Sequence, residues 1–377
     1  MSNSPLIPGT APSDSDLAEV YRESDAGSAG RRAEAVLASP NEIFLLATDD
    51  GAEGEQTALV SLAGDGTVVQ EWRYPASEGA GRGFARRADA SFVIAGDLRR
   101  AASAYQAHLL AVDRAGSVVT QRAFGPLGPT GLVSIVSLSS GLMIAAGTAN
   151  WKGWLVRVDE TSESSIPLPE SNDVFGVCTR ADGGFAAASV FEASTTSLGR
   201  ARIMAWSADC AEDWRANLPA SGRGELTGLV ELRDGSLVGI GHIEAPGRKP
   251  TQIWVVCIDS RGTPSWERSL GSHRFEHRGR AISLMGDGGF AIAGDYIEDD
   301  IRRPYLARLD ANGDLLWEHL DGGADRQLVV RGIAATPGGI VIVGSIQLSD
   351  QKTAAWISEF DMDGRARWGR TIPAPQR

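Results

Sequence analysis

The feature that most constrains this chain is a unit of about fifty residues that recurs along most of its length. The clearest copy runs from Arg278 to Leu320. It contains four short apolar runs, AISL, FAIAGD, YLARLD and LLWEHL, separated by GDGG, a polar loop and ANGD. Each run is too short for a helix and is rich in β-forming residues. The unit therefore predicts a meander of four antiparallel strands.

Seven such units follow one another along the chain. They span residues 31–79, 80–128, 129–171, 172–222, 223–273, 274–323 and 324–373. A four-stranded unit of this length cannot bury both of its faces alone, so neighbouring units must stack around an axis. We therefore predict an all-β fold, a seven-bladed β-propeller of four-stranded antiparallel blades. An open β-solenoid is the alternative architecture, but its rungs are shorter and lack hairpin turns at both ends.

Two signatures recur inside the units. The second strand is an apolar run such as FLLATD, FVIAGD or IVIVGS, and the third and fourth strands are joined by a tight turn with Asp and Gly. The fourth strand often carries a tryptophan, which we expect to anchor one blade against the next. These tryptophans are Trp72, Trp266, Trp317 and Trp368. The unit 129–171 lacks both the glycine turn and the tryptophan, so its outer strand is expected to be irregular.

Residues 1–30 are rich in Ser, Pro, Asp and Ala and are predicted to form a tail. Within this segment, Leu17 to Glu23 is similar to the last strand of a unit, because the residues that follow it have the same pattern as those after LLWEHL. It either adds a strand to the closing blade or forms a short helix.

The repeats also resemble known families. The combination of DGGFAIAG, YLARLD and NGDLLW resembles the long repeats of bacterial propeller proteins of unassigned function. The string ARLDANGDLLWEH is similar to the PQQ-like repeat of quinoproteins and of outer-membrane assembly scaffolds. The PQQ-like unit is shorter, and the enzymes that use the quinone have more blades and a metal beside the cofactor. The resemblance therefore implies the fold, and we expect no cofactor.

The composition of the chain limits the classes of partner that it is expected to bind. With 36 basic and 48 acidic residues, the formal net charge is −12, which argues against a nucleic-acid binder because such proteins neutralise phosphates with a basic surface. No signal peptide and no long apolar run is evident, so we expect no membrane association and a cytoplasmic protein of a bacterium. The three cysteines, Cys178, Cys210 and Cys257, form no CxxC pair, and neither a disulfide framework nor a zinc site is expected.

Several motifs have simpler structural interpretations. The ANGD and DMDG turns lack the late carboxylate of a calcium loop and are predicted to be β-turns. The glycines of GDGGFAIAG lie between two strands, not between a strand and a helix, which excludes a dinucleotide loop. His273 and His277 are four residues apart, but they lie in a segment between two blades, so no metal site is expected.

The best candidate site comes from aligning the units. In each unit, the alignment pairs one residue of the first strand with the residue at the end of the second strand. First strands line the axis of a propeller. The aligned pairs are Glu34 with Asp49, Arg82 with Asp97, Val133 with Thr148, Phe175 with Val190, Thr227 with His242, Arg280 with Asp295, and Arg331 with Ser345. All of these residues are expected to ring one end of the central channel. The candidate binding residues among them are Asp49, Arg82, Asp97, His242, Arg280, Asp295 and Arg331.

This polar ring has two interpretations. In the first, Arg82 and Arg280 form cross-strand salt bridges that contribute about 0.2–1 kcal/mol each. In the second, Arg82, Arg280 and Arg331 bind a carboxylate or another anion of a ligand. The same end carries the segments between second and third strands, LRRAASAY, SVFEASTTSLGRA, IEAPGRKPT and YIEDDIRRP, which we expect to be long variable loops that form a binding surface.

Two functions remain open. The first is a non-catalytic scaffold that binds a partner protein or peptide on its loop-rich face, as a monomer or as a subunit of a hetero-complex. The alternative is a lyase or hydrolase whose site at the channel mouth uses His242 with arginine and aspartate neighbours. A propeller fold hosts both kinds of function, so the fold does not decide between them.

Overall fold

The computed structural model describes most of the chain from Gly30 onwards. The described residues are 30–51, 54–74, 79–101, 104–159, 162–168, 171, 173–191, 199–218, 223–244, 250–320, 326–349 and 352–374. The predicted tail before Gly30, including the segment from Leu17 to Glu23, lies outside these residues. No helix long and apolar enough to cross a membrane occurs in the described part of the chain.

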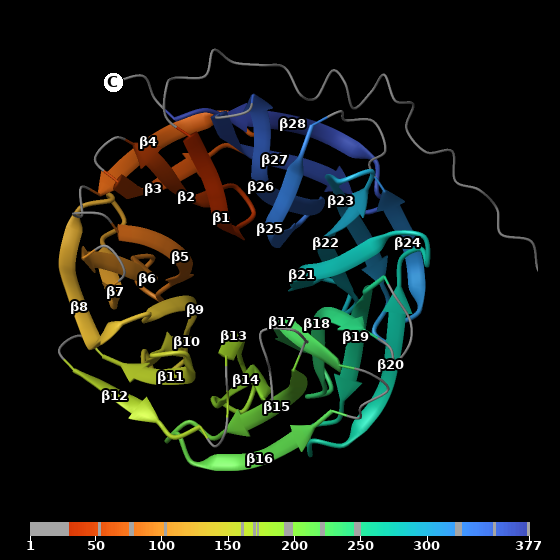
Figure 1. Cartoon of the computed structure of the whole chain (residues 1–377), viewed down its shortest axis with the longest axis horizontal. Coiled ribbons are helices and arrows are strands. Elements are labelled where there is room, and N and C mark those ends of the chain that lie inside the picture. Colours follow the sequence, from red (N-terminus) through yellow and green to blue (C-terminus); the bar gives the residue numbers. More distant parts are fainter. Residues whose placement is uncertain are drawn as a thin grey trace, which may run out of the picture.

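Seven sheets stand around a common axis, and each contains four antiparallel strands in chain order (Figure 1). The innermost strands are β1 (Gly30–Ala38), β5 (Gly79–Arg86), β9 (Gly131–Ser137), β13 (Asp173–Thr179), β17 (Arg223–Glu231), β21 (Glu276–Leu284) and β25 (Leu328–Thr336). The second strands are β2 (Ile43–Gly51), β6 (Phe92–Ala101), β10 (Met143–Ala149), β14 (Phe185–Phe191), β18 (Leu237–Glu244), β22 (Phe290–Glu298) and β26 (Gly339–Ser349). The predicted seven-bladed β-propeller is thereby confirmed.

The outer half of each blade completes the sheet. The third strands are β3 (Gly54–Leu62), β7 (Ala104–Val112), β11 (Lys152–Val158), β15 (Arg200–Trp206), β19 (Gln252–Ile258), β23 (Ile301–Leu309) and β27 (Lys352–Asp361). The outermost strands are β4 (Val68–Tyr74), β8 (Val118–Gly128), β12 (Glu163–Ile166), β16 (Glu212–Asn217), β20 (Pro264–Leu270), β24 (Leu315–Leu320) and β28 (Ala366–Ile372). In the third blade the outermost strand, β12, has only 4 residues.

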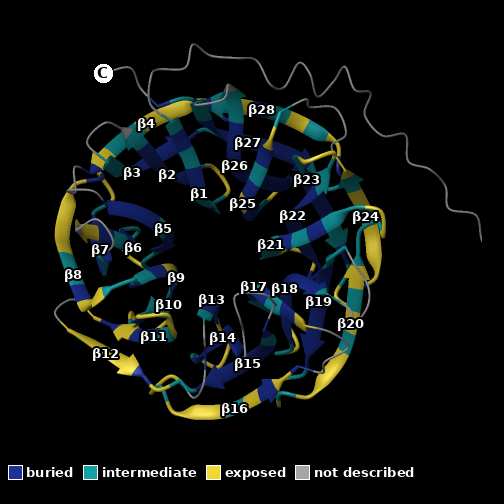
Figure 2. Ribbon diagram, viewed as in Figure 1, coloured by how far each residue is buried: buried dark blue, intermediate teal, exposed yellow. Residues whose placement is uncertain are grey.

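The core lies between the blades. Second and third strands are buried on both faces, whereas the outermost strands alternate between exposed and partly buried residues (Figure 2). The buried apolar side chains form seven clusters, and each cluster joins two neighbouring blades. This is why the second strands are continuous apolar runs, since a strand that is covered on both faces needs no polar alternation.

Tryptophans of the outermost strands connect one blade to the next. The ring of Trp317 lies over Gly364, in the turn of the following blade, so closely that a Cβ on this glycine would be 3.0 Å from the ring. The indole N–H of Trp317 also donates to the carbonyl oxygen of Met362 at 2.9 Å. The same contact with the next turn is made by Trp72 on Gly116, Trp214 on Gly262, Trp266 on Gly313 and Trp368 on Gly66. Each of these glycines has a positive φ, as the tight turn requires.

Replacing Trp317 by alanine is expected to lower the free energy of unfolding by about 2–3 kcal/mol, less than for a fully buried tryptophan because the ring is partly exposed. Chemical denaturation provides the measurement. Trp151, which is 78% exposed, provides the matched control, and its replacement by alanine is expected to change stability by less than about 0.5 kcal/mol. Equal effects at the two positions would mean that the inter-blade tryptophans do not hold the blades together.

One expected loop is a tight turn instead. The segment from Tyr296 to Pro304 continues β22 and β23 through to a two-residue turn at Asp299 and Asp300, whose φ angles are 49° and 64°. The prediction of a long loop here was wrong, because aspartate tolerates the left-handed conformation that a two-residue hairpin needs. Parts of the other three predicted loops, residues 102–103, 192–198 and 245–249, lie outside the described residues.

Candidate functional site

Every innermost strand contains a β-bulge at the same place. The bulged residues are Glu34, Arg82, Val133, Phe175, Thr227, Arg280 and Arg331. We call these seven residues the axial ring. They are the first members of the pairs aligned in sequence, but the predicted partners do not face them across the ladder. Asp97 is paired with Ala80 and Asp295 with Arg278, because a bulge inserts a residue that has no cross-strand partner.

The alignment of Asp49 was also wrong by one residue. In the first blade, Thr48 occupies the place that Asp97 occupies in the second, because the turn from Ser39 to Glu42 is one residue shorter than the turn from Arg87 to Ser91. A shift of one residue moves a side chain to the other face of a strand. Asp49 therefore points away from the axial ring.

A small residue follows each bulge. These residues are Ala35, Gly83, Ser134, Gly176, Gly228, Ala281 and Gly332. Neighbouring innermost strands approach each other closely here: a Cβ on Gly83 would lie 2.8 Å from the carbonyl oxygen of Val133 in the next blade. The bulge followed by a small residue thus packs the inner strands together at one level of the axis.

The axial ring has a charged arc and a neutral arc. Consecutive blades contribute Arg280, Arg331, Glu34 and Arg82 on one side and Val133, Phe175 and Thr227 on the other. Val133 is 42% exposed although it lies on an innermost strand. Because the two faces of such a strand are covered by neighbouring blades, this exposure is directed toward the axis. The ring is therefore amphipathic across its diameter.

The arginines of the charged arc are paired with carboxylates. Arg82 donates to Asp97 at 3.0 Å, and Arg280 donates to Asp295 at 2.8 Å. Glu34 lies within 3.3 Å of Arg82 and 3.4 Å of Arg331, so it joins the first blade to both of its neighbours. The structure thus contains the cross-strand salt bridges of Arg82 and Arg280 that the sequence suggested. Glu34 adds ion pairs between neighbouring blades.

Asp49 belongs to a buried network that sequence reasoning missed. Arg31 has no exposed surface and donates to Asp49 at 2.5 and 2.8 Å and to Glu71 at 2.8 and 3.1 Å. These three residues connect β1, β2 and β4 of the first blade. No spacing rule indicates that Glu71, on the outermost strand, meets Arg31, on the innermost one.

His242 does meet a carboxylate. Its Nε2 atom is 3.3 Å from Oε1 of Glu225, the residue that faces it across the ladder. The His242 side chain is only 4% exposed, and burial, together with the positive charges of Arg278 and Arg280, lowers its pKa to about 3. A neutral imidazole with so low a pKa is a weak proton acceptor at neutral pH.

His273 and His277 make different contacts, and His277 lies in β21 rather than in the expected segment between two blades. His277 is fully buried, and its Nε2 atom accepts the backbone N–H of Ser272 at 2.9 Å. His273 is exposed and contacts Gln252. Among the described residues, no group of three or more potential metal ligands occurs.

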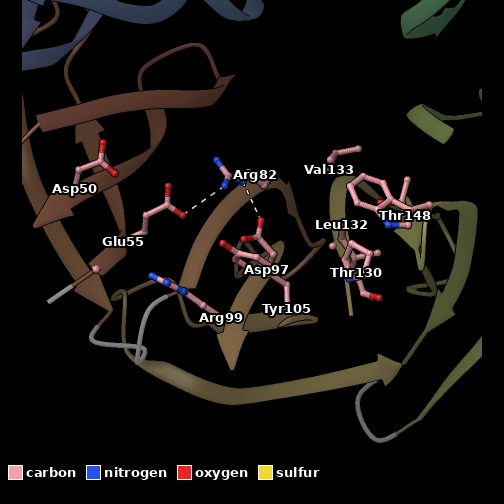
Figure 3. A pocket seen from close by; sticks show the side chains of 14 residues that line it. Asp50, Glu55, Arg82, Asp97, Arg99, Tyr105, Thr130, Leu132, Val133 and Thr148 are labelled. Carbon is pink, nitrogen blue, oxygen red and sulfur yellow. Dashed lines mark hydrogen bonds and ion pairs between the residues drawn. The ribbon is translucent and has the colours of Figure 1, made fainter. Parts of the chain in front are cut away.

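A pocket of about 490 Å³ lies beside the axial ring, between the first three blades (Figure 3). It shares Arg82 and Val133 with the ring. Its wall is formed by Asp50, Gly54, Glu55, Arg82, Asp97, Arg99, Tyr105, Pro129, Thr130, Gly131, Leu132, Val133, Thr148 and Trp151. In Figure 3, Glu55 and Asp97 flank the guanidinium of Arg82, and Leu132, Val133 and Thr148 of the third blade face them. Sequence reasoning had located only Arg82 and Asp97 among its candidate residues.

Trp151 is the most unusual residue of this wall. It forms, with Asn150, the two-residue turn between β10 and β11, and the φ angles of the two residues are 51° and 63°. Such turns favour glycine at the second position, and the left-handed conformation costs a bulky residue about 1–2 kcal/mol. Trp151 is nevertheless 78% exposed and gains little from burial. A strained, exposed aromatic residue indicates selection for something other than stability.

The wall also contains polar groups that are incompletely satisfied. Thr130 is 2% exposed, and its hydroxyl has no hydrogen-bond partner among the described residues. Burial raises the pKa of the Asp97 carboxyl, although Arg82 opposes this shift. Gly131 allows β9 to approach Asp97, since a Cβ there would lie 3.2 Å from the Cβ of the aspartate.

The pocket lies where the second and third blades meet, and this contact lacks the tryptophan that joins the first blade to the second. The outermost strand of the second blade has no tryptophan, and Arg122 instead donates to Glu163 and to the carbonyl oxygens of Asp159 and Ser162 in the third blade. Two further cavities, of about 100 and 620 Å³, are lined by residues of these same two blades. The contact between the second and third blades therefore borders three cavities.

Comparisons with known proteins agree on the fold. Neither a family model nor a curated protein matches the sequence. Among solved structures, a virginiamycin B lyase from Staphylococcus aureus has 12% identity and a TM-score of 0.59, covering 87% of this chain and 94% of its own. YCF48 bound to D1 peptide has 14% identity and a TM-score of 0.53, with 86% and 94% covered. Sqt1 from Chaetomium thermophilum has 11% identity and a TM-score of 0.54, with 93% and 87% covered. At these identities the likeness is one of fold: the chain is a seven-bladed β-propeller.

Proposed function

We propose that this propeller is a protein-interaction module that binds a partner protein or peptide at the end of the axis where the axial ring and the pocket lie. The observation that carries the proposal is Trp151, a strained and exposed aromatic residue on the rim of a polar pocket. Tryptophan is enriched among the residues that dominate binding energy at interfaces.

The surroundings of Trp151 support this proposal. Leu127 is 60% exposed and precedes Gly128, whose backbone packs against Asn150 of the same turn. Val133 adds exposed apolar surface on the neutral arc of the axial ring. Apolar anchors beside satisfied ion pairs are the usual composition of a protein-binding surface. A propeller of similar fold, YCF48, was solved with a peptide bound, which is consistent with such a role.

The catalytic alternative at His242 receives less support. Glu225 is close enough to orient the imidazole, but the side chain of His242 is almost fully covered. A substrate would have to reach a histidine that burial keeps neutral. Other groups at this end of the axis are more accessible than His242, including Arg331, whose side chain is 36% exposed, and Val133, which is 42% exposed.

Panning a random-peptide display library against the whole chain tests the proposal. The affinity of the best peptide is then measured by fluorescence polarisation on variants. Trp151→Ala is expected to weaken binding about tenfold or more, as for a residue that anchors an interface. Val69→Ala, which removes apolar surface from an outermost strand where Val69 is 67% exposed, is the matched control and should leave affinity within about twofold. Peptides whose binding depends on Val69 and not on Trp151 would place the interaction surface elsewhere.

A further inference from the structure

We propose that the pocket between the first three blades accepts a basic side chain, a lysine ammonium or an arginine guanidinium, that is carried by the bound peptide. The inference rests on the proposed function, since it assigns the chemistry of the residue that the pocket receives. It follows from the charges, the hydrogen-bonding capacity and the aromatic groups of the wall.

The charges of the wall favour a cation. Three carboxylates, those of Asp50, Glu55 and Asp97, line the pocket together with the guanidinium groups of Arg82 and Arg99. Arg32, which does not line the pocket, also donates to Asp50 and Glu55, but the two oxygens of each carboxylate can accept further hydrogen bonds. The whole chain has a formal net charge of −12, so a basic partner is attracted over longer distances as well.

Hydrogen-bonding capacity favours a donor. Arg82 already uses its Nε, Nη1 and Nη2 atoms on Asp97, Glu34 and Glu55. The Oδ1 atom of Asp97 accepts the hydrogen bond from Arg82, and a carboxylate with two oxygens can accept further hydrogen bonds. A ligand that brings N–H donors would add hydrogen bonds to this carboxylate.

Aromatic side chains complete the site. Trp151 and Tyr105 both line the pocket, and the indole of Trp151 is held on its rim by the short turn. A cation is attracted to the face of an aromatic ring, and tryptophan is the strongest partner. Carboxylates together with an exposed indole therefore suit an ammonium or a guanidinium group better than any other side chain.

Two other occupants fit less well. An acidic side chain would meet Asp50, Glu55 and Asp97, and three of the five N–H donors of Arg82 are already engaged with carboxylates. An apolar side chain would remove water from the carboxylates of the wall without replacing its hydrogen bonds, which is costly for polar groups. Burial raises the pKa of Asp97 and Asp50, and a bound cation would stabilise the charged forms of both carboxyls.

The test uses the indole N–H resonances of the 15N-labelled whole chain, which has 10 tryptophans. The variant Trp151→Gly identifies the resonance of Trp151 by its loss, and glycine suits the positive φ of this turn, so the fold is retained. The probes are N-acetyl-arginine amide, N-acetyl-norleucine amide and N-acetyl-glutamate amide. The arginine probe is expected to shift the Trp151 resonance at millimolar concentration. The other two probes should not shift it.

A charge-removing variant makes the test specific. Glu55→Gln and Asp97→Asn keep the shape of the wall, and each is expected to weaken the arginine probe about fivefold or more. Thermal midpoints show whether each variant is folded. If one variant does not fold, the other one carries the test. An equal response to the glutamate or norleucine probe, or an arginine response that both variants leave unchanged, would overturn the proposal.

Peptide panning separates this inference from the proposed function. Peptides that depend on Trp151 and carry an arginine or lysine whose replacement by glutamine weakens binding about tenfold support both. Peptides that depend on Trp151 but contain no important basic residue refute the basic-side-chain pocket and leave the interaction module standing. If the arginine probe binds while no peptide depends on Trp151, the pocket chemistry holds and the proposed function fails.

Discussion

Replacing Arg31 by alanine is expected to lower the free energy of unfolding by about 3–5 kcal/mol, because it leaves two carboxylates without their buried partner. The guanidinium is fully covered and makes four hydrogen bonds, two to Asp49 and two to Glu71. Arg31→Lys should recover little of this loss, since an ammonium cannot contact both carboxylates in the bidentate geometry of the guanidinium. Urea denaturation at neutral pH measures the effect.

Arg73 provides the matched control. Its Nε atom is 2.7 Å from Glu71, so it contacts the same carboxylate, but its side chain is 37% exposed. Arg73→Ala should therefore cost less than about 1 kcal/mol. Similar losses for Arg31→Ala and Arg73→Ala would show that burial does not decide the strength of this network.

Lowering the pH from 7 to 5 is expected to destabilise the fold by about 2 kcal/mol for each of His108 and His242, about 4 kcal/mol together. Burial, with a smaller contribution from Arg100, lowers the pKa of His108 to about 4, and burial with Arg278 and Arg280 lowers that of His242 to about 3. The unfolded chain has an ordinary histidine pKa near 6.5 and takes up these protons first. Stability that is fully present above the unfolded pKa is thus lost as the pH falls toward the folded values.

Variants isolate this effect from other titrations. Burial raises the pKa of Asp97, Asp295 and Glu225, and these carboxyls act in the opposite direction at lower pH. The comparison is therefore between the wild type and His108→Asn, each unfolded in urea at both pH values. The variant should lose about 2 kcal/mol less on acidification. An unchanged response of His108→Asn would contradict the prediction.

The sequence was sufficient for the fold because the information is local and repeated. A run such as FAIAGD followed by YLARLD needs no distant partner to be recognised as two strands, and seven copies leave little choice of architecture. The alignment also brought together the residues that form the bulges of the axial ring. It could not show that they are bulges, since the extra residue in the ladder is visible only when both strands are placed.

The pocket was harder to predict for physical reasons. Trp151 has no partner at a fixed spacing, and its strain is a property of the backbone rather than of a sequence motif. Thr130 is significant because it is buried without a hydrogen-bond partner among the described residues, which no composition reveals. The sequence does contain one signal near the pocket: the second unit has Arg122 where the first has Trp72, and this missing tryptophan marks the contact with the third blade as different.

The way the ring closes has a consequence for its ancestry. Each blade is one continuous segment, from β1–β4 in the first to β25–β28 in the last, and no strand is exchanged between blades in the described part of the chain. Trp368 crosses from the last blade to Gly64 and Gly66 of the first just as Trp317 crosses from the sixth to the seventh. The junction between the last and first blades thus has the same construction as the four other junctions at which an outermost-strand tryptophan contacts the next turn. A gene that encodes such a ring can gain or lose a blade by duplication or deletion of one repeat, or can be circularly permuted. In each case the new junction can use the same contact between a tryptophan and the next turn.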